Sequence, residues 1–173
     1  MGVETNMQRP KVYLESATIS YLTARPSENL ANKFRQERTR LWWQYRGRYE
    51  LFVSETVVNE IQRGDQEAAR LRLEIIEGIP VLPHSDQVKL LARVFVSAGA
   101  MPPIAVVDAY HIITAAIHQM DYLVTWNQKH LVNPVKRRQI EELILGFQLK
   151  PPVIITPEQL LYQENLTERE DLL

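Results

Sequence analysis

The sequence contains no cysteine among its 173 residues. This absence excludes disulfide bonds and thiolate metal sites, and it suits a reducing cytoplasm, where we expect the protein to work. No apolar run approaches the roughly 20 residues that a membrane-spanning helix needs. The N-terminal segment MGVETNMQRP also lacks the apolar core of a signal peptide. The sequence therefore predicts a protein without a membrane partner.

The chain also lacks an excess of charge of either sign, because its formal net charge is −1. Any contact with nucleic acid therefore has to use a local basic patch. The length suits one domain with a sizeable core and is short for two. We assign residues 1–162 to a single domain and the polar segment 163–173 to a frayed tail.

Short apolar runs alternate with segments of helical periodicity. The predicted strands lie at residues 12–14, 50–54, 79–82, 122–125 and 153–156. The predicted helices lie at residues 28–46, 55–62, 66–77, 85–98, 103–119 and 134–146, and a further helix is expected to begin just after Glu15. This alternation favours an α/β fold in which a parallel sheet carries helices on both faces.

Three carboxylates occupy unusual positions in this pattern. Glu15 comes directly after the first strand, and Glu60 lies in the helix after the second. Asp108 lies in IAVVDAYHIITAAI, a helix that is apolar on almost all faces, and no lysine or arginine occurs between residues 94 and 128 to pair with it. A lone buried carboxylate is costly unless it is paired or binds a metal.

A cluster of these carboxylates around a divalent cation would satisfy all three, because ligands of open α/β sheets bind at the carboxyl ends of the strands. Oxygen ligands favour Mg²⁺ or Mn²⁺, whose chemistry suits phosphodiester hydrolysis. The spacing alone is equally compatible with a structural interpretation. In that interpretation, Glu15 caps a helix and Glu60 is a solvated helix residue.

His111 follows Asp108 by three residues and shares its helix face. We expect it to hydrogen-bond a carboxylate or the scissile phosphate, the alternative being a packed histidine with a backbone partner. A zinc site built from His111, His118 and Asp108 is disfavoured, because the histidines are seven residues apart and no HExxH motif is present.

Three segments occur in the order KVYLESATISYLTARPS, LFVSETVVNEIQRGDQEAARLRL and PPIAVVDAYHIITAAIHQMDYLVTWNQKHLVNP. Together, over about residues 11–156, they resemble the PIN-domain family, specifically the VapC-type toxin ribonucleases of type II toxin–antitoxin systems. The resemblance implies a three-layer sandwich with a parallel sheet of four to five strands. It also implies cleavage of RNA with Mg²⁺ or Mn²⁺ and a cognate antitoxin as partner, and we expect a homodimer.

The resemblance places the catalytic set on Glu15, Glu60, Asp108 and Asn127, the first three as metal ligands. It places Ser16 and Thr125 in supporting positions around these ligands, and the spacing from Asp108 adds His111 to them.

Glu15 departs from the family, whose first acid is normally aspartate. The extra methylene moves the carboxylate, and Mg²⁺ requires near-ideal octahedral geometry, so Glu15 either binds through water, favours Mn²⁺ or inactivates the site. The alternative function is therefore an attenuated domain that binds RNA or an antitoxin without cleavage. Asn127 replaces an aspartate of many members and disfavours a second metal ion.

The segment NKFRQERTRLWWQYRGR combines arginines with adjacent tryptophans, which suits contact with RNA or with the antitoxin. The residues predicted to form this surface are Arg35, Arg38, Trp42, Trp43 and Arg46. The alternative is an amphipathic helix with one tryptophan in the core. Trp126 is expected to pack beneath the site with a partner for its indole N–H.

Two other α/β classes fit poorly. A haloacid-dehalogenase-like hydrolase needs DxDx[TV] after the first strand, where this chain has ESATI. A flavodoxin-like protein needs a phosphate-binding loop there, and none of the six glycines follows that strand.

Overall fold

The computed structural model describes residues 8–127 and 134–170, and for residues 134, 135 and 165–170 it describes the backbone alone. Within these ranges the chain forms one five-stranded sheet in the order β3-β2-β1-β4-β5, and every neighbouring pair is parallel. The strands are β1 (Lys11–Leu14), β2 (Glu50–Ser54), β3 (Val81–Leu82), β4 (Tyr122–Val124) and β5 (Val153–Ile155). Each lies within or beside a predicted strand, which confirms the α/β class.

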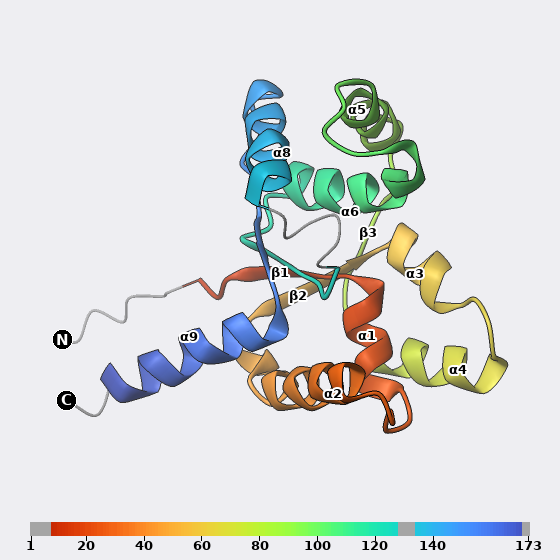
Figure 1. The fold of residues 1–173 in the computed structure, drawn as a ribbon, viewed down its shortest axis with the longest axis vertical. Coiled ribbons are helices and arrows are strands. Elements are labelled where there is room, and N and C mark those ends of the chain that lie inside the picture. The colour runs from red at the N-terminus through yellow and green to blue at the C-terminus, as the bar shows by residue number, and fades with distance from the viewer. Residues whose placement is uncertain (1–7, 128–133, 171–173) are drawn as a thin grey trace.

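Helices cover both faces of the sheet (Figure 1). They are α1 (Ser16–Thr23), α2 (Leu30–Trp43), α3 (Glu55–Ile61), α4 (Gln66–Ile75), α5 (Asp86–Ser97), α6 (Val106–Ile117), α8 (Pro134–Gly146) and α9 (Pro157–Glu170). Figure 1 shows α5, α6 and α8 on one side of the strands and α1, α2 and α9 on the other. None of the helices in the described ranges combines the length and hydropathy that crossing a bilayer requires.

Helix α9 was not among the predicted helices, although the sequence TPEQ signals its start. The Thr156 hydroxyl accepts from the Gln159 N–H, and the Gln159 side chain accepts from the Thr156 N–H, which is a reciprocal capping box. The described helix continues past residue 162, the predicted end of the domain, and Glu164 is buried against Arg48 and Tyr49. Residues 171–173 of the predicted tail lie outside the described residues.

Two helices that directly follow strands, α1 and α3, begin on polar caps at the carboxyl edge of the sheet. Ser54 ends β2 and accepts from the Val57 N–H at the start of α3. Glu15 follows β1 and accepts from the Ala17 N–H at the start of α1. Capping side chains replace the missing partners of the first helical N–H groups. The strand ends are therefore also helix starts, which concentrates polar groups at one edge of the sheet.

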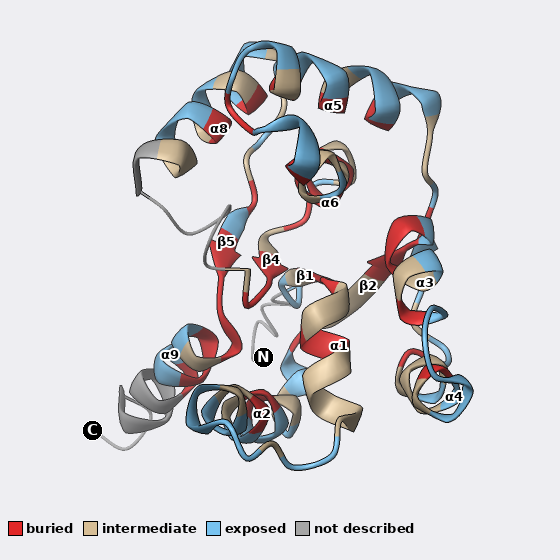
Figure 2. Cartoon of the chain, turned by 45° about the vertical axis from the view of Figure 1, so that its right-hand side comes forward, coloured by how far each residue is buried: buried red, intermediate tan, exposed pale blue. Residues whose placement is uncertain are grey.

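The core lies on both faces of the central strands, where the buried residues in Figure 2 meet. Val12, Tyr13 and Leu14 of β1 are fully buried. The apolar stripe of α5 is core rather than dimer surface, because Val88 and Phe95 are also fully buried.

Trp126, which follows β4, is buried as predicted. Its indole N–H donates to the Thr39 hydroxyl of α2 over 2.7 Å. This hydrogen bond gives the buried indole N–H a partner and links α2 to the segment that follows β4.

The amino edge of the sheet is held by Asp121, which accepts from the Lys11 N–H over 2.9 Å and from Lys150 Nζ over 3.1 Å. Burial opposes ionisation of Asp121, but these two hydrogen bonds outweigh it and hold the pKa of the carboxyl below its ordinary value of 3.8. The ionised form therefore stabilises the folded state.

We expect Asp121→Asn to lower the free energy of unfolding by about 1 kcal/mol at pH 7, the usual scale for one hydrogen bond. Because the folded pKa is depressed, the stabilisation is present above about pH 4 and is lost as the pH falls through the folded value. Urea unfolding from pH 7 to pH 3 checks this, with the exposed Glu77→Gln as control. An equal difference between parent and variant at every pH would contradict it.

Candidate active site

Glu15 lies beside Thr125 at the carboxyl edge of the sheet. Leu14 pairs with Val124 between β1 and β4, so Glu15 and Thr125, which follow them, lie at the same height along the two strands. The Glu15 N–H also donates to the Val124 carbonyl over 3.2 Å. The side chain of Glu15 is 7% exposed, so its carboxylate is held within the edge of the sheet rather than in bulk solvent.

Both oxygens of Glu15 accept hydrogen bonds. The Ser16 hydroxyl donates to Oε1 over 2.7 Å, and the Ala17 N–H and the Thr125 hydroxyl each donate to Oε2 over 3.1 Å. Ser16 and Thr125 thus contact the acid that they were predicted to support. Glu15 also caps α1, as the structural interpretation required, so this one side chain serves the fold as well as the candidate site.

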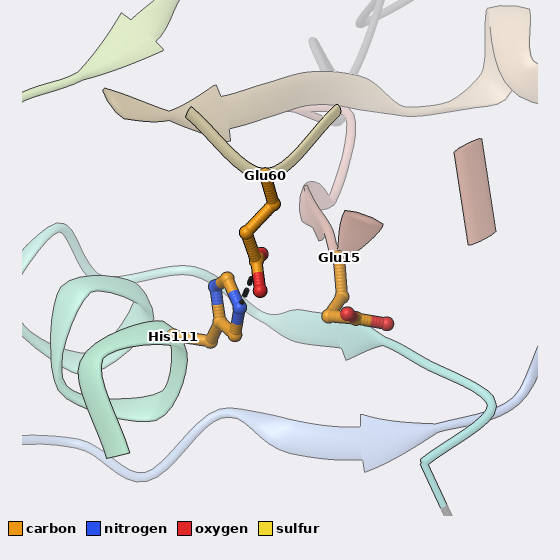
Figure 3. Close-up of side chains that lie close together, drawn as sticks. All are labelled: Glu15, Glu60 and His111. Atoms are coloured by element: carbon orange, nitrogen blue, oxygen red, sulfur yellow. Dashed lines mark ion pairs between the residues drawn. The ribbon is translucent and has the colours of Figure 1, made fainter. Parts of the chain in front are cut away.

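Glu60 and His111 point toward one another beside Glu15, as Figure 3 shows. His111 Nε2 lies 3.0 Å from Glu60 Oε2. One ligand atom from each of Glu15, Glu60 and His111 lies within 4.8 Å of the other two, which is close enough to hold one metal ion. His111 therefore contacts a carboxylate, as predicted, and Glu60 is not a freely solvated helix residue.

The carboxyl of Glu60 is half-buried, and its ionisation depends on its neighbours. Burial alone would raise its pKa, but the hydrogen bond and charge of His111 outweigh burial, with smaller help from Ser16 and Arg63. The pKa of Glu60 is therefore lowered, and the group is a carboxylate at neutral pH.

Behind His111 lies a buried chain of hydroxyl groups. Tyr13 Oη is 2.7 Å from His111 Nδ1 and 2.6 Å from Ser54 Oγ. Ser54 Oγ also accepts from the Val57 N–H at the start of α3. Tyr13 therefore links Ser54 to Nδ1 on one side of the imidazole, and Nε2 on the other side faces Glu60. Burial raises the pKa of Tyr13, which keeps the phenol protonated for this role.

Tyr13 and Ser54 were missed by sequence reasoning. Tyr13 is two residues before Glu15 and so shares its side of β1, which was the available signal. Its partner on α6 is distant in sequence, so only the fold identifies the contact.

Asp108 joins the site through Asn127 rather than through the other acids. Asn127 Nδ2 donates to Asp108 Oδ1 over 2.9 Å, and the Asn127 N–H donates to the Thr125 hydroxyl over 2.9 Å. A path of hydrogen bonds therefore runs from Asp108 through Asn127 and Thr125 to Glu15. In the described part of the chain, Asp108 is not in the group of ligand atoms formed by Glu15, Glu60 and His111. Its role as a metal ligand stays a prediction.

The predicted surface on α2 needs one correction. Trp42 is fully buried and packs against Tyr49, with ring centroids 6.0 Å apart, so it offers no surface to RNA or a partner. Its neighbour Trp43 is half-buried and lies under the guanidinium of Arg46, which is 5.2 Å from the ring centroid. Adjacent positions of a helix face different directions, so only one of the two tryptophans can point fully into the core, and that one is Trp42.

Two further arginines of this surface contact their own chain. Arg35 donates to the Tyr21 hydroxyl over 3.3 Å, and Arg38 lies 3.8 Å from Glu158. These contacts favour the interpretation of α2 as an amphipathic helix, and a role of its exposed side chains in RNA or antitoxin binding stays a prediction.

We expect Tyr13→Phe to lower the free energy of unfolding by about 1–3 kcal/mol, because His111 Nδ1 and the Ser54 hydroxyl are left buried without this partner. Urea unfolding at pH 7 measures the change. Tyr162→Phe is the matched control, because Tyr162 is 66% exposed. Equal unfolding midpoints for the two variants would show that the buried hydroxyl chain contributes nothing to stability.

Neither a family model nor a curated protein matches the sequence. Solved structures that share the fold include two toxin structures. Rickettsia felis VapBC2, bound to a DNA fragment from its promoter, is matched with a TM-score of 0.52 and 13% identity over 84% of this chain and 98% of that one. Mycobacterium tuberculosis VapC20, a toxin that cleaves the sarcin–ricin loop, is matched with a TM-score of 0.55 and 12% identity. This match covers 69% of the present chain and 92% of VapC20. The chain therefore has the fold of the VapC-type PIN domains.

Proposed function

We propose that the protein is a metal-dependent endoribonuclease, the toxin of a toxin–antitoxin pair, which hydrolyses RNA phosphodiesters with Mg²⁺ or Mn²⁺. The observation that carries the proposal is the convergence of Glu15 and Glu60 at the carboxyl edge of the sheet, with a buried histidine against one of them. Ligands of parallel α/β sheets bind at this edge. The shared fold with VapC20, named as a toxin that cleaves the sarcin–ricin loop, supports RNA as the substrate.

The donor atoms suit a hard divalent cation. Both ring nitrogens of His111 are occupied, Nδ1 by Tyr13 and Nε2 by Glu60, so the imidazole orients Glu60 and leaves the carboxylate oxygens as ligands. Carboxylate oxygens favour Mg²⁺ or Mn²⁺ over zinc. Glu15 and Glu60 would hold the ion, and Asp108, which accepts a hydrogen bond from Asn127, would complete the proposed set of ligands.

When bound, the ion supplies a water of lowered pKa and positive charge for the phosphoryl oxygens. The residues of the chain prepare the site for this chemistry. His111 keeps Glu60 ionised and fixes its direction, while Ser16 and Thr125 fix the direction of Glu15. Asn127 holds Asp108 in place at the first turn of α6. Such preorganisation spares the site a rearrangement during the reaction.

The second candidate is an attenuated domain that binds RNA or an antitoxin without cleaving. The observation that favours it is the environment of Glu15, whose oxygens accept three hydrogen bonds while capping α1. A ligand that already serves the fold is less free to adjust to the strict geometry of Mg²⁺.

The partners that we propose are the RNA substrate, a cognate antitoxin and a second copy of the chain. The Rickettsia felis neighbour is named as VapBC2 on promoter DNA, which supports the antitoxin. Exposed apolar side chains support the homodimer, because Ile104 is 87% exposed and Leu90 is 61% exposed. We place the protein in the cytoplasm, in keeping with its lack of cysteine.

We expect Asp108→Asn to lower the rate of RNA cleavage by at least roughly 10- to 100-fold, the usual cost of losing a group that supports a metal site. Initial rates on a panel of single-stranded RNAs with Mn²⁺ measure the effect, and thermal unfolding checks the fold. Asp86→Asn is the control, because the Asp86 side chain is 99% exposed. Cleavage by Asp108→Asn at the parent rate would show that the site assignment is wrong.

We expect the parent to bind Mn²⁺ in a calorimetric titration and Glu15→Asp to change the affinity by less than roughly tenfold, about 1.4 kcal/mol. A nuclease that uses Glu15 has already adapted its site to the longer side chain. Absence of binding by the parent together with clear binding by Glu15→Asp would establish the attenuated domain instead.

A further inference from the structure

A cavity of about 200 Å³ opens beside Glu60, and the proposed reaction leaves it unused. It lies between α3, the segment that leads into α5, and the first turns of α6. Its lining consists of Thr56, Asn59, Glu60, Arg63, His84, Val107 and Tyr110. Because Glu60 belongs to both places, whatever fills the cavity lies next to the candidate metal ligands.

Two aromatic rings form one side of the cavity. His84 and Tyr110 pack edge to face, with centroids 4.6 Å apart and an interplanar angle of 85°. His84 is held at both its ring and its backbone, because Nδ1 is 2.9 Å from the Thr56 hydroxyl and its N–H donates to Glu55 over 2.7 Å. The rings are therefore fixed in place before any ligand arrives.

The histidine ring is also uncharged at neutral pH. Burial lowers the pKa of His84 below its ordinary value of 6.5, and the charge of Lys89 lowers it further against the opposing charges of Glu55 and Asp86. The rings thus offer a neutral π surface, on which a flat uncharged ring can stack.

Two polar side chains of the cavity, Arg63 and Asn59, are exposed. No hydrogen bond or close ion pair of the Arg63 guanidinium is found among the described residues, and its positive charge helps to lower the pKa of Glu60. The Asn59 side chain, also exposed, offers one amide donor and one acceptor on the same helix. The positive charge of Arg63 and the negative charge of Glu60 balance, so the lining of the cavity is close to neutral. Such a lining suits an uncharged ring that carries an anionic group at the Arg63 end.

We propose that this cavity binds one nucleotide of single-stranded RNA, adjacent to the phosphodiester that is cleaved over Glu15 and Glu60. The base stacks against His84 and Tyr110, Asn59 contacts its polar edge, and Arg63 binds its phosphate. Single-stranded RNA is recognised by splayed bases that stack on aromatic side chains and by arginine contacts to phosphate. This inference rests on the proposed nuclease function and assigns a base preference to this cavity.

Fluorescence anisotropy with labelled eight-nucleotide homopolymers of A, C, G and U tests the proposal. EDTA in the buffer keeps cleavage from interfering. We expect the parent protein to prefer one of the four bases. Tyr110→Leu should bind the preferred RNA roughly 5- to 150-fold more weakly and lose the preference. Tyr110→Phe should keep both the affinity and the base preference of the parent. Arg63→Gln should weaken all four RNAs similarly and reduce the dependence of log affinity on log salt by about 0.7.

The matched control is Arg138→Gln on α8, which removes one exposed positive charge outside the cavity and should bind like the parent. Arg63→Gln changes an exposed side chain, so it tests the cavity even where Tyr110→Leu unfolds. The proposal would be overturned if Tyr110→Leu and Arg63→Gln both bound RNA like the parent. It would also be overturned if the parent bound none of the four RNAs, and the cavity would then be a candidate site for a protein partner.

Cleavage assays with Mn²⁺ separate this inference from the nuclease itself. Cleavage by Tyr110→Leu at the parent rate and positions would overturn the nucleotide site while the nuclease stands. Loss of RNA binding in Tyr110→Leu and Arg63→Gln, with no cleavage by the parent, would support the nucleotide site and remove the nuclease.

Discussion

The contact between His111 and Glu60 is the interaction on which the site depends. The imidazole is fully enclosed, and its far nitrogen is held by Tyr13, which is held in turn by Ser54. Two strands and the apolar helix α6 therefore meet at one carboxylate. The buried hydrogen bonds of Tyr13 hold the imidazole in place, and the imidazole in turn keeps the Glu60 carboxyl ionised.

Glu15 shows how structure and function compete for one side chain. It caps α1 and accepts from two hydroxyl groups, and it also stands at the sheet edge where the proposed metal ion would bind. Aspartate is the better helix cap, and its shorter side chain holds its oxygens closer to the backbone. Glutamate reaches further from the same backbone position, and one of its oxygens lies within 4.8 Å of a Glu60 oxygen.

The strands were predictable because buried parallel strands are continuous apolar runs, and Val12 to Leu14 form such a run in the sequence. Helix starts are also local signals, because the caps Asp65 of α4 and Ser85 of α5 each accept from an N–H of the turn that follows them. Helix α9 could have been found from Thr156 and Gln159, but the polar residues that follow obscured it. Trp42 and Trp43 could not be distinguished, because adjacent tryptophans carry the same local signal and only packing against α2's neighbours selects the buried one.

The sequence by itself determined the order along the chain of the strands and of the helices before α9. It also placed Glu15 directly after a strand, and Glu60 and Asp108 on helices. These features depend on local periodicity and on the rule that parallel strands end at a common edge. Only the tertiary structure decided which groups touch: that His111 holds Glu60, that Tyr13 stands behind it, and that Asp108 reaches Glu15 through Asn127 and Thr125. Hydrogen bonds between side chains far apart in sequence depend on ångström-scale placement, and that placement is set by the packing of the whole core.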